Sequence, residues 1–358
     1  MARTRRPTQS DIARVAGVSP AVVSLVINGR TDGKIRISDE TQGRVRQAIQ
    51  DLGYVPNMAA RQLAGGRNRL IGVFTYEPVF PLGETNFYYP FLVGIEEQAE
   101  ALGYDLLLFT RNDRETGRRM VYRDGINALQ VADGAVLLGT NEDRSELARI
   151  LADGFPFVFA GRREINGVPL AYVGADYAAA ASEIVEHLAA LGHRSILYLH
   201  NTVVDNNESA TDRLTGVRAG LGRTNLPADD GRILCAEEAQ ITAGQVGAWL
   251  EAGTTAFVTQ TLGIAQAILR AAAGCGLQAP RDFSIAALGN SESGVIDDGT
   301  FTSIDIPQRE MGAGSVRMLV DLLERPNESP TKQVILPCRI RPGFTTGPAP
   351  ATIPVFQP

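Results

Sequence analysis

The stretch TQSDIARVAGVSPAVVSLVING, residues 8–29, has the pattern of two short helices joined by a tight turn. Thr8 is suited to cap the first helix, and Asp11, three residues later, makes a variant of the capping box. Gly17 permits a sharp turn because it has no side chain. The pattern therefore predicts a first helix that ends at this turn.

A second helix is expected immediately after the turn. Ser19 suits its N-cap, and Pro20 suits its first position, where a missing N–H costs nothing. Val23, Val26 and Ile27 recur at helical spacing. They predict one face that packs on neighbouring helices.

A third helix is expected to begin at Ser38 and to stop at Gly53, with an apolar stripe over 45–52. Three short helices around one core, two of them joined by a tight turn, are typical of a helix-turn-helix head. Many small three-helix bundles share this pattern. The charge of the segment is therefore needed to distinguish a DNA-binding head from other bundles.

Charge is distributed unevenly along the chain. Residues 1–69 hold 12 Lys and Arg against 5 Asp and Glu, a net charge of +7. The remaining 22 basic and 35 acidic residues give −13, so the total of −6 hides a basic head on an acidic body. This asymmetry favours a head that binds nucleic acid.

The rest of the composition is that of a globular protein, with 44% hydrophobic and 21% charged residues over 358 positions. We see no apolar run of membrane-spanning length and no secretory signal, so we expect a cytoplasmic protein with no membrane partner. Cys235, Cys275 and Cys338 lie far apart, which argues against disulfides and against a zinc site.

The segment PNMAARQLAGG, residues 56–66, can form about two helical turns, a length that is marginal for a helix in water. Two interpretations are open. It is either a linker helix packed on the body or a segment that folds when a partner supports it.

From residue 69 onward, short apolar runs alternate with amphipathic stretches. This alternation predicts parallel sheets with helices on both faces. About ten strands are too many for one such sheet, so we expect two doubly wound lobes with a ligand cleft at the strand ends. The expected strands are 70–74, 105–109, 134–139, 155–161, 170–175, 195–199, 231–236, 255–260, 284–289 and 301–305.

Residues 8–29, followed by LGYVPNMAARQLAGG at 52–66, resemble the LacI/GalR family of bacterial transcription factors, over essentially the whole chain. The resemblance implies an all-α helix-turn-helix head with a hinge helix, and an α/β two-lobed effector domain like the periplasmic binding proteins. The implied bounds are 1–56 for the head, 57–68 for the hinge helix and linker, and 69–358 for the effector and dimerisation domain. Lobe 1 would take about 69–173 and 306–335, and lobe 2 about 174–305 and 336–350.

The resemblance also implies how DNA is bound. The second helix would enter the major groove, and paired hinge helices would enter the minor groove, where Leu63 would wedge between base pairs. Ala60 would let the two hinges approach closely, and Asn57 would cap the hinge. The full implied set is Thr8, Ser19, Pro20, Ala21, Val22, Ser24, Leu25, Asn28, Arg30, Lys34, Asn57, Ala60 and Leu63.

The second helix departs from many relatives on its outward face. The side chains of Pro20, Ala21 and Leu25 cannot make the paired hydrogen bonds that read bases, although alanine and leucine can touch a thymine methyl group. Ser24 and Asn28 suit phosphates. The basic loop at 29–38 either contributes general charge or contacts DNA directly.

The effector site is expected at the strand ends of the body. Aromatic residues of the loop at 75–94 suit stacking on a sugar ring, and Arg213 aligns with an arginine that contacts ligand in many family members. Arg162 is either a ligand contact or a surface salt bridge. The candidate set is Tyr76, Phe87, Thr110, Arg162, Asn207, Ser209, Arg213, Gln260, Asn290 and Glu292. Gln260 stands where relatives commonly carry an Asn-Asp pair, and Glu292 could replace a lost carboxylate.

These features predict a DNA-binding repressor that acts as a homodimer, with a small-molecule effector, a sugar or sugar derivative, between its lobes. No cofactor or metal is expected, because the chain has no phosphate-binding glycine loop, no GxSxG elbow and no metal-ligand cluster. The alternative is a solute-binding or sugar-modifying protein with the same body. The sequence leaves open whether the effector releases or promotes DNA binding.

Overall fold

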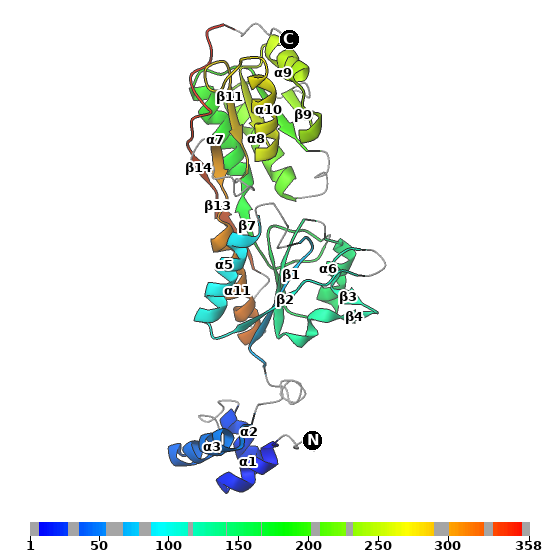
Figure 1. Ribbon diagram of the computed structural model, residues 1–358, viewed down its shortest axis with the longest axis vertical. Coiled ribbons are helices and arrows are strands. Elements are labelled where there is room, and N and C mark those ends of the chain that lie inside the picture. The colour runs from blue at the N-terminus through cyan, green and yellow to red at the C-terminus, as the bar shows by residue number, and fades with distance from the viewer. Residues whose placement is uncertain are drawn as a thin grey trace. The chain divides into compact units, whose positions relative to one another are not determined.

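The computed structural model describes residues 7–27, 36–54, 67–78, 87–113, 117–140, 142–165, 167–201, 208–226, 232–289, 301–325 and 332–352. The chain divides into two compact units, Met1–Asn68 and Arg69–Pro358, which we call the head and the body. Figure 1 shows the head in dark blue and the body from cyan to red.

The described head contains α1 (Gln9–Ala16), α2 (Pro20–Ile27) and α3 (Asp39–Leu52). The predicted caps are confirmed. The Thr8 N–H donates to Asp11 Oδ2 at 2.9 Å, while Thr8 Oγ1 accepts from the Asp11 N–H, which completes the capping box. Gly17 and Gly53 end α1 and α3 with φ of 67° and 59°, a region that disfavours other residues.

Apolar side chains from all three helices form the core of the head. Ile12 of α1, Val23 of α2 and Val45 of α3 are fully buried. Burial of such a side chain stabilises a fold by about 1.5–3 kcal/mol. This shared core fixes the orientation of α2 relative to α1 and α3.

Lobe 1 of the body is built, in the described part of the chain, on a six-stranded parallel sheet in the order β13-β7-β6-β5-β1-β2. Its strands are β1 (Leu70–Thr75), β2 (Asp105–Phe109), β5 (Gly134–Leu138), β6 (Phe157–Ala160), β7 (Tyr172–Asp176) and β13 (Gln333–Pro337). A small hairpin, β3 (Tyr122–Arg123) and β4 (Ile126–Asn127), lies beside it.

Lobe 2 has a second sheet in the order β14-β12-β11-β10-β8-β9, parallel except for β14. Its strands are β8 (Ile196–His200), β9 (Ile233–Cys235), β10 (Ala256–Thr259), β11 (Ser284–Ala287), β12 (Thr302–Asp305) and β14 (Arg339–Arg341). Helix-turn-helix elements followed by two α/β lobes confirm the predicted fold class.

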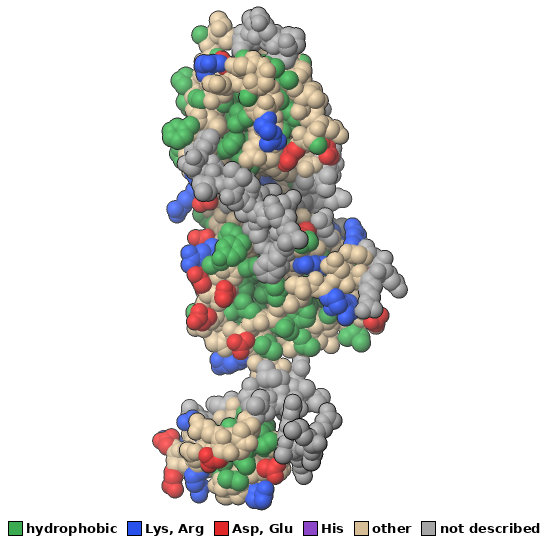
Figure 2. All heavy atoms as spheres, viewed as in Figure 1, with side chains coloured by type: hydrophobic (Ala, Val, Ile, Leu, Met, Phe, Trp, Pro, Cys, Tyr) green, Lys and Arg blue, Asp and Glu red, His purple; other side chains and the backbone are tan. Residues whose placement is uncertain are grey.

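The helices of the body cover both sheets (Figure 1). They are α5 (Tyr89–Ala101), α6 (Arg144–Ala152), α7 (Tyr177–Ala190), α8 (Glu208–Arg223), α9 (Ala243–Glu251), α10 (Leu262–Ala273) and α11 (Gln308–Glu324). Although α5 and α11 are far apart in the sequence, they lie side by side. Figure 2 shows acidic and basic side chains along this side of lobe 1, where Arg309 pairs with Glu97 at 2.5 Å.

The chain crosses between the lobes after β7, after β12 and between β13 and β14. The first and third crossings differ from the expected lobe bounds of 173 and 335. Both of those positions lie inside strands, because β7 and β13 pair with each other from Tyr172↔Gln333 to Asp176↔Pro337. Lobe 1 therefore keeps both strands to their ends.

Glycines bring α7 and α8 of lobe 2 into close contact. A Cβ atom at Gly216 of α8 would lie 2.1 Å from the main-chain oxygen of Ala178 in α7. One at Gly220 would lie 2.8 Å from the main-chain oxygen of Ser182. This crossing fixes α8, whose first turns line the candidate site described next.

Candidate functional site

In the head, the N-terminal end of α2 is exposed. Ser19, Pro20 and Ala21 are exposed, and the Val22 N–H donates to Ser19 Oγ at 3.4 Å. Val22 and Leu25 are half-buried and pack partly against the core of the head. On the outward face expected from the sequence, Pro20 and Ala21 are thus exposed, while Ser24 and Leu25 are half-buried.

Several predicted residues lie outside the described residues. They are Asn28, Arg30, Lys34, Asn57, Ala60 and Leu63 of the DNA-binding set, and Asn207, Asn290 and Glu292 of the effector set.

A cavity of about 160 Å³ lies in lobe 2, at the carboxyl ends of β8 and β10 and beside the first turns of α8. Ligands of open α/β sheets bind at this edge. Gln260, predicted from the sequence, is in the lining, and its Oε1 accepts from the Asn201 N–H at 3.4 Å. The described lining residues are Tyr198, His200, Asn201, Ala210, Thr211, Leu214 and Gln260.

Tyr198 gives this cavity an unusual polar group. The side chain is 1% exposed, and within the described part of the chain its hydroxyl has no hydrogen-bond partner. Burial raises the pKa of the Tyr198 phenol, so the group stays a neutral donor and acceptor. A buried hydroxyl without a partner costs about 1–3 kcal/mol, which a ligand hydroxyl would relieve.

Arg213 lies close to the cavity but is engaged by the protein. Its Nε donates to the main-chain oxygen of Leu288 at 2.6 Å, and its Nη1 to that of Ser209 at 3.0 Å. Its guanidinium stacks 4.0 Å from the ring centroid of Tyr177. Arg213 therefore ties α8 to the end of β11. Its ligand contact stays a prediction.

In lobe 1, Tyr76 lies in the core, so its predicted stacking on a ligand has no support from the geometry and stays a prediction. Its ring is 8% exposed and packs edge-on to Phe74, and its hydroxyl donates to Glu146 at 3.2 Å. The chain still pairs with β5 at this position, because the Tyr76 N–H donates to the Leu138 carbonyl, so strand alternation directs the ring into the core. Phe87 is half-buried against Tyr88 and Phe91, and Thr110 is exposed after β2.

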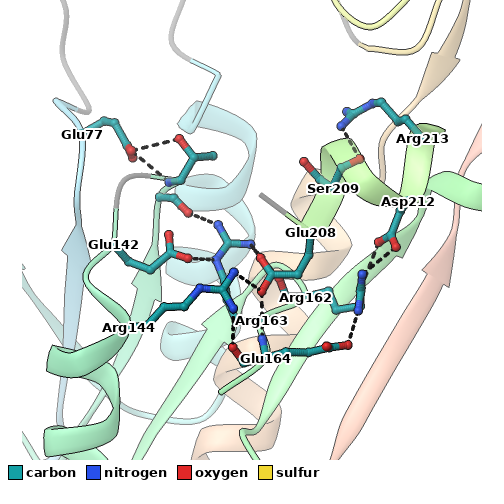
Figure 3. Close-up of polar contacts among 12 residues, drawn as sticks. Glu77, Glu142, Arg144, Arg162, Arg163, Glu164, Glu208, Ser209, Asp212 and Arg213 are labelled. Atoms are coloured by element: carbon teal, nitrogen blue, oxygen red, sulfur yellow. Dashed lines mark hydrogen bonds and ion pairs between the residues drawn. The ribbon is translucent and has the colours of Figure 1, made fainter. Parts of the chain in front are cut away.

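Seven charged residues join the two lobes, and we call them the interlobe cluster: Glu142, Arg144, Arg162, Arg163, Glu164, Glu208 and Asp212 (Figure 3). Arg162 of lobe 1 makes two hydrogen bonds to Asp212 of α8, from Nε at 2.9 Å and from Nη2 at 2.6 Å. Arg162 was expected to be either a ligand contact or a surface salt bridge. The structure shows a salt bridge, and it joins the two lobes. Such paired bonds hold both groups in one geometry.

Arg163 is the buried centre of this cluster. Its Nε lies 2.7 Å from Glu142 Oε1, and its Nη1 lies 3.7 Å from Glu208 Oε2. Glu208 Oε1 also accepts from Arg144 at 2.8 Å and from the Glu164 N–H at 3.0 Å. Burial raises the pKa of Glu142, although Arg163 opposes this shift.

Apart from Arg162, the sequence interpretation missed the interlobe cluster. A signal was present, because Arg162-Arg163-Glu164 directly follows an apolar strand, where a charged run has no structural role in the sheet itself. The partners in α8 could not be identified, since nothing local links the two segments.

We also searched the described residues for metal-ligand groups and for membrane-spanning helices. Within them, no group of three or more His, Cys, Asp and Glu is placed to hold a metal ion. No single described helix is long and apolar enough to cross a membrane, although the bent pair α1 and α2 passes by length and composition.

Comparison with known proteins matches both units. Residues 8–57 match the family described as bacterial regulatory proteins, lacI family, and residues 185–346 match a periplasmic binding protein-like domain. Catabolite control protein A of Streptococcus mutans is 29% identical over 344 residues, covering 94% of this chain and 97% of that protein. The maltose regulon regulatory protein MalI of Escherichia coli K12 is 28% identical over 354 residues, covering 95% and 99%.

A solved structure extends the likeness to the fold. The lac repressor dimer bound to operator and the anti-inducer ONPF has a TM-score of 0.69 and 25% identity, covering 96% of this chain and 100% of that one.

Proposed function

Since this chain belongs to the LacI family of bacterial regulatory proteins, and is thus a DNA-binding transcriptional regulator and not an enzyme, we propose that a sugar bound in its body controls its affinity for operator DNA. The observation that carries the proposal is the cavity in lobe 2 with the unpaired hydroxyl of Tyr198. Its lining contains no Asp, Glu, Lys or Arg among the described residues, and it suits a ligand rich in hydroxyl groups. One relative is named for a maltose regulon.

An effector can act as a switch if it binds two arrangements of the protein unequally. The interlobe cluster would make the two lobes interdependent, because its ion pairs join the lobes and would break if the lobes moved apart. A sugar that binds the two arrangements with different affinities would therefore shift the balance between them. The mechanism fits an effector that releases the protein from DNA and equally one that promotes DNA binding. We favour a repressor in either case.

We further propose a homodimer that works in the bacterial cytoplasm, where chromosomal DNA lies. The edge strand β13 supports this, because Val334 and Ile335 are 38% and 43% exposed at an open sheet edge. The lac repressor structure is a dimer on its operator. Two heads related by symmetry would read two half-sites of a pseudo-palindrome.

On each half-site, the exposed end of α2 would enter the major groove, with the Ala21 methyl near a thymine methyl and Ser19 near a phosphate. The domain bounds proposed are 1–56 for the head, 57–68 for the hinge and 69–358 for the effector domain. Because α2 offers few groups that can read bases, much of the specificity would come from the hinge and from DNA deformability.

Replacing Leu63 by alanine is expected to weaken specific operator binding at least about tenfold, the equivalent of a mismatched base pair. The reason is that the proposed wedge would be lost, while phosphate contacts would remain. The measurement is a titration of operator and of random DNA at one fixed salt concentration. Gln62→Ala is the matched control in the same segment. Equal loss on both DNAs in the Leu63 variant would contradict the wedge.

Replacing Tyr198 by phenylalanine is expected to have opposite effects on stability and on binding. Without ligand the variant should be more stable by about 1 kcal/mol, because a buried unpaired hydroxyl is removed. Affinity for the effector should fall about tenfold, because a ligand hydrogen bond is lost. Thermal shift with maltose, cellobiose, glucose and ribose measures both.

The matched control for this test is Tyr122→Phe. The Tyr122 hydroxyl donates to Asp153 at 2.5 Å in lobe 1, so its loss should lower stability and leave sugar affinity unchanged. Sugar affinity that is the same in Tyr198→Phe and in the unmodified protein would remove this cavity from the effector site.

A further inference from the structure

Two carboxylates from opposite lobes each keep one oxygen without a hydrogen-bond partner. Glu142 follows β5 of lobe 1, and Glu208 begins α8 of lobe 2; their side chains are 3% and 7% exposed. In the described part of the chain, Oε2 of each has no hydrogen bond. For Glu208 Oε2 the nearest cation is Arg163 at 3.7 Å, an ion pair beyond hydrogen-bond length.

The other oxygen of each carboxylate is fully engaged. Glu142 Oε1 lies against Arg163, and Glu208 Oε1 accepts from Arg144 and from the Glu164 N–H. Figure 3 shows the two side chains approaching Arg163 from opposite sides. Within the described residues, Arg163 Nε also makes no hydrogen bond, although it lies against Glu142 Oε1 as an ion pair. Protein interiors pair nearly all buried polar atoms, so the two carboxylate oxygens mark a place where a ligand could supply donors.

The two carboxylates lie near the lobe 2 cavity through α8. Glu208 and Thr211, which lines the cavity, are three residues apart on this helix, a rise of about 4.5 Å along its axis. The Tyr198 hydroxyl in the same cavity is a further buried group without a partner in the described part of the chain, and it comes from a different element. Unsatisfied groups therefore occur both in the cavity and at the lobe boundary beside it.

The arginines of the cluster are not available to an anion. Arg162 is held by Asp212 and Glu164, and Arg163 by Glu142. The nearby Arg213 donates to two main-chain carbonyls. An incoming carboxylate or phosphate would thus meet the free oxygens of Glu142 and Glu208, which are acceptors and carry the same charge.

We propose that Glu142 and Glu208 form an acceptor subsite for the effector, which selects neutral or amino sugars and rejects sugar acids and sugar phosphates. The inference rests on the proposed sugar-controlled function and deepens it. The hydroxyl or ammonium groups of the ligand donate to the two Oε2 atoms, one in each lobe. Because both atoms are shielded from solvent, the ligand reaches them when the lobes part, and its bonds to both lobes then favour reclosure.

The first test uses the full chain and matched ligands. Calorimetric titration compares glucose with glucosamine, gluconate and glucose 6-phosphate, and ribose with ribose 5-phosphate; maltose and cellobiose widen the neutral set. We expect a neutral or amino sugar to bind at least about tenfold more tightly than its anionic counterpart. An anionic sugar that binds as tightly as its neutral counterpart, or more tightly, overturns the subsite while leaving the sugar-effector proposal intact.

The second test uses Glu142→Gln and Glu208→Gln, which keep the shape of each side chain. Each substitution should lower the affinity for the neutral sugar about tenfold. Each should also reduce the ratio between the affinities for the neutral sugar and for its anionic counterpart. Glu97→Gln is the matched control, because this glutamate is 50% exposed and pairs with Arg309, outside the interlobe cluster. The sugar affinity of this control variant should equal that of the unmodified protein.

The outcomes separate the two proposals. Sugar binding that is unchanged in both variants overturns the acceptor subsite alone. If no sugar of either set binds while the chain still binds its operator, both the sugar effector and the subsite are overturned. A loss confined to Glu142→Gln and Glu208→Gln, with both variants folded by circular dichroism, supports the subsite.

Discussion

Replacing Arg163 by methionine is expected to lower the free energy of unfolding of the body by about 3–5 kcal/mol at pH 7, the range for breaking a buried ion pair. Arg163 is 5% exposed and lies between two buried carboxylates. Methionine fills much of the volume and can still pack on the Phe159 ring, which now lies 4.5 Å from the guanidinium. The loss therefore comes chiefly from polar groups, because Glu142 loses its ion-pair partner and the main-chain oxygens of Gly139 and Arg162 lose a donor.

The deficit of this variant should depend on pH. Burial already raises the pKa of Glu142, and Arg163 opposes that shift, so the pKa rises further in the variant. A carboxyl whose folded pKa is raised is not penalised below its unfolded pKa, about 4.3, and is increasingly penalised as the pH rises through the folded value. The deficit should thus be smallest near pH 4.5 and grow toward pH 7.5.

Urea unfolding followed by circular dichroism between pH 4.5 and 7.5 measures this. Arg144→Met is the matched control, because Arg144 also pairs with Glu208 but its side chain is 46% exposed. Such a pair contributes at most about 1 kcal/mol. Equal losses in the two variants, or a deficit in Arg163→Met that does not change with pH, would contradict a buried charge at the centre of the interlobe cluster.

Local features of the fold could be predicted from the sequence. The capping residues Thr8 and Ser38 act within three residues of their position, so they can be identified without knowledge of the fold. The ten expected strands all appear, because each is a short apolar run bounded by polar residues. β13 and β14 were missed. β14 (RIR) has no such run, and β13 (QVILP) has one but lies exposed or half-buried at a sheet edge.

The site was harder to predict, because it depends on contacts between distant segments. Gln260 was found since it follows a buried strand at the expected sheet edge. Tyr76 also follows such a strand, yet its ring enters the core, and the sequence cannot tell which side of a strand end a ring will take. The bonds from Arg162 to Asp212 join positions 50 residues apart, which no local pattern links.

Replacing Gly216 by alanine is expected to destabilise the body by about 3 kcal/mol, at the upper end for overpacking. The added Cβ would lie 2.1 Å from the main-chain oxygen of Ala178, and a backbone atom cannot move aside as a side chain can. The crossing of α7 and α8 would have to open. Because Thr211 and Leu214 on α8 line the cavity, sugar affinity should fall as well.

Gly222, further along α8, provides a control of opposite sign, because a Cβ there has no heavy atom within 4 Å. Gly222→Ala should raise stability by about 0.5–1 kcal/mol, since alanine loses less backbone entropy in a helix. Both variants exchange the same residues on one helix, so helix propensity alone would shift them in the same direction. Chemical unfolding of the two proteins separates the effects, and a gain in stability for Gly216→Ala would show that α8 does not cross α7 this closely.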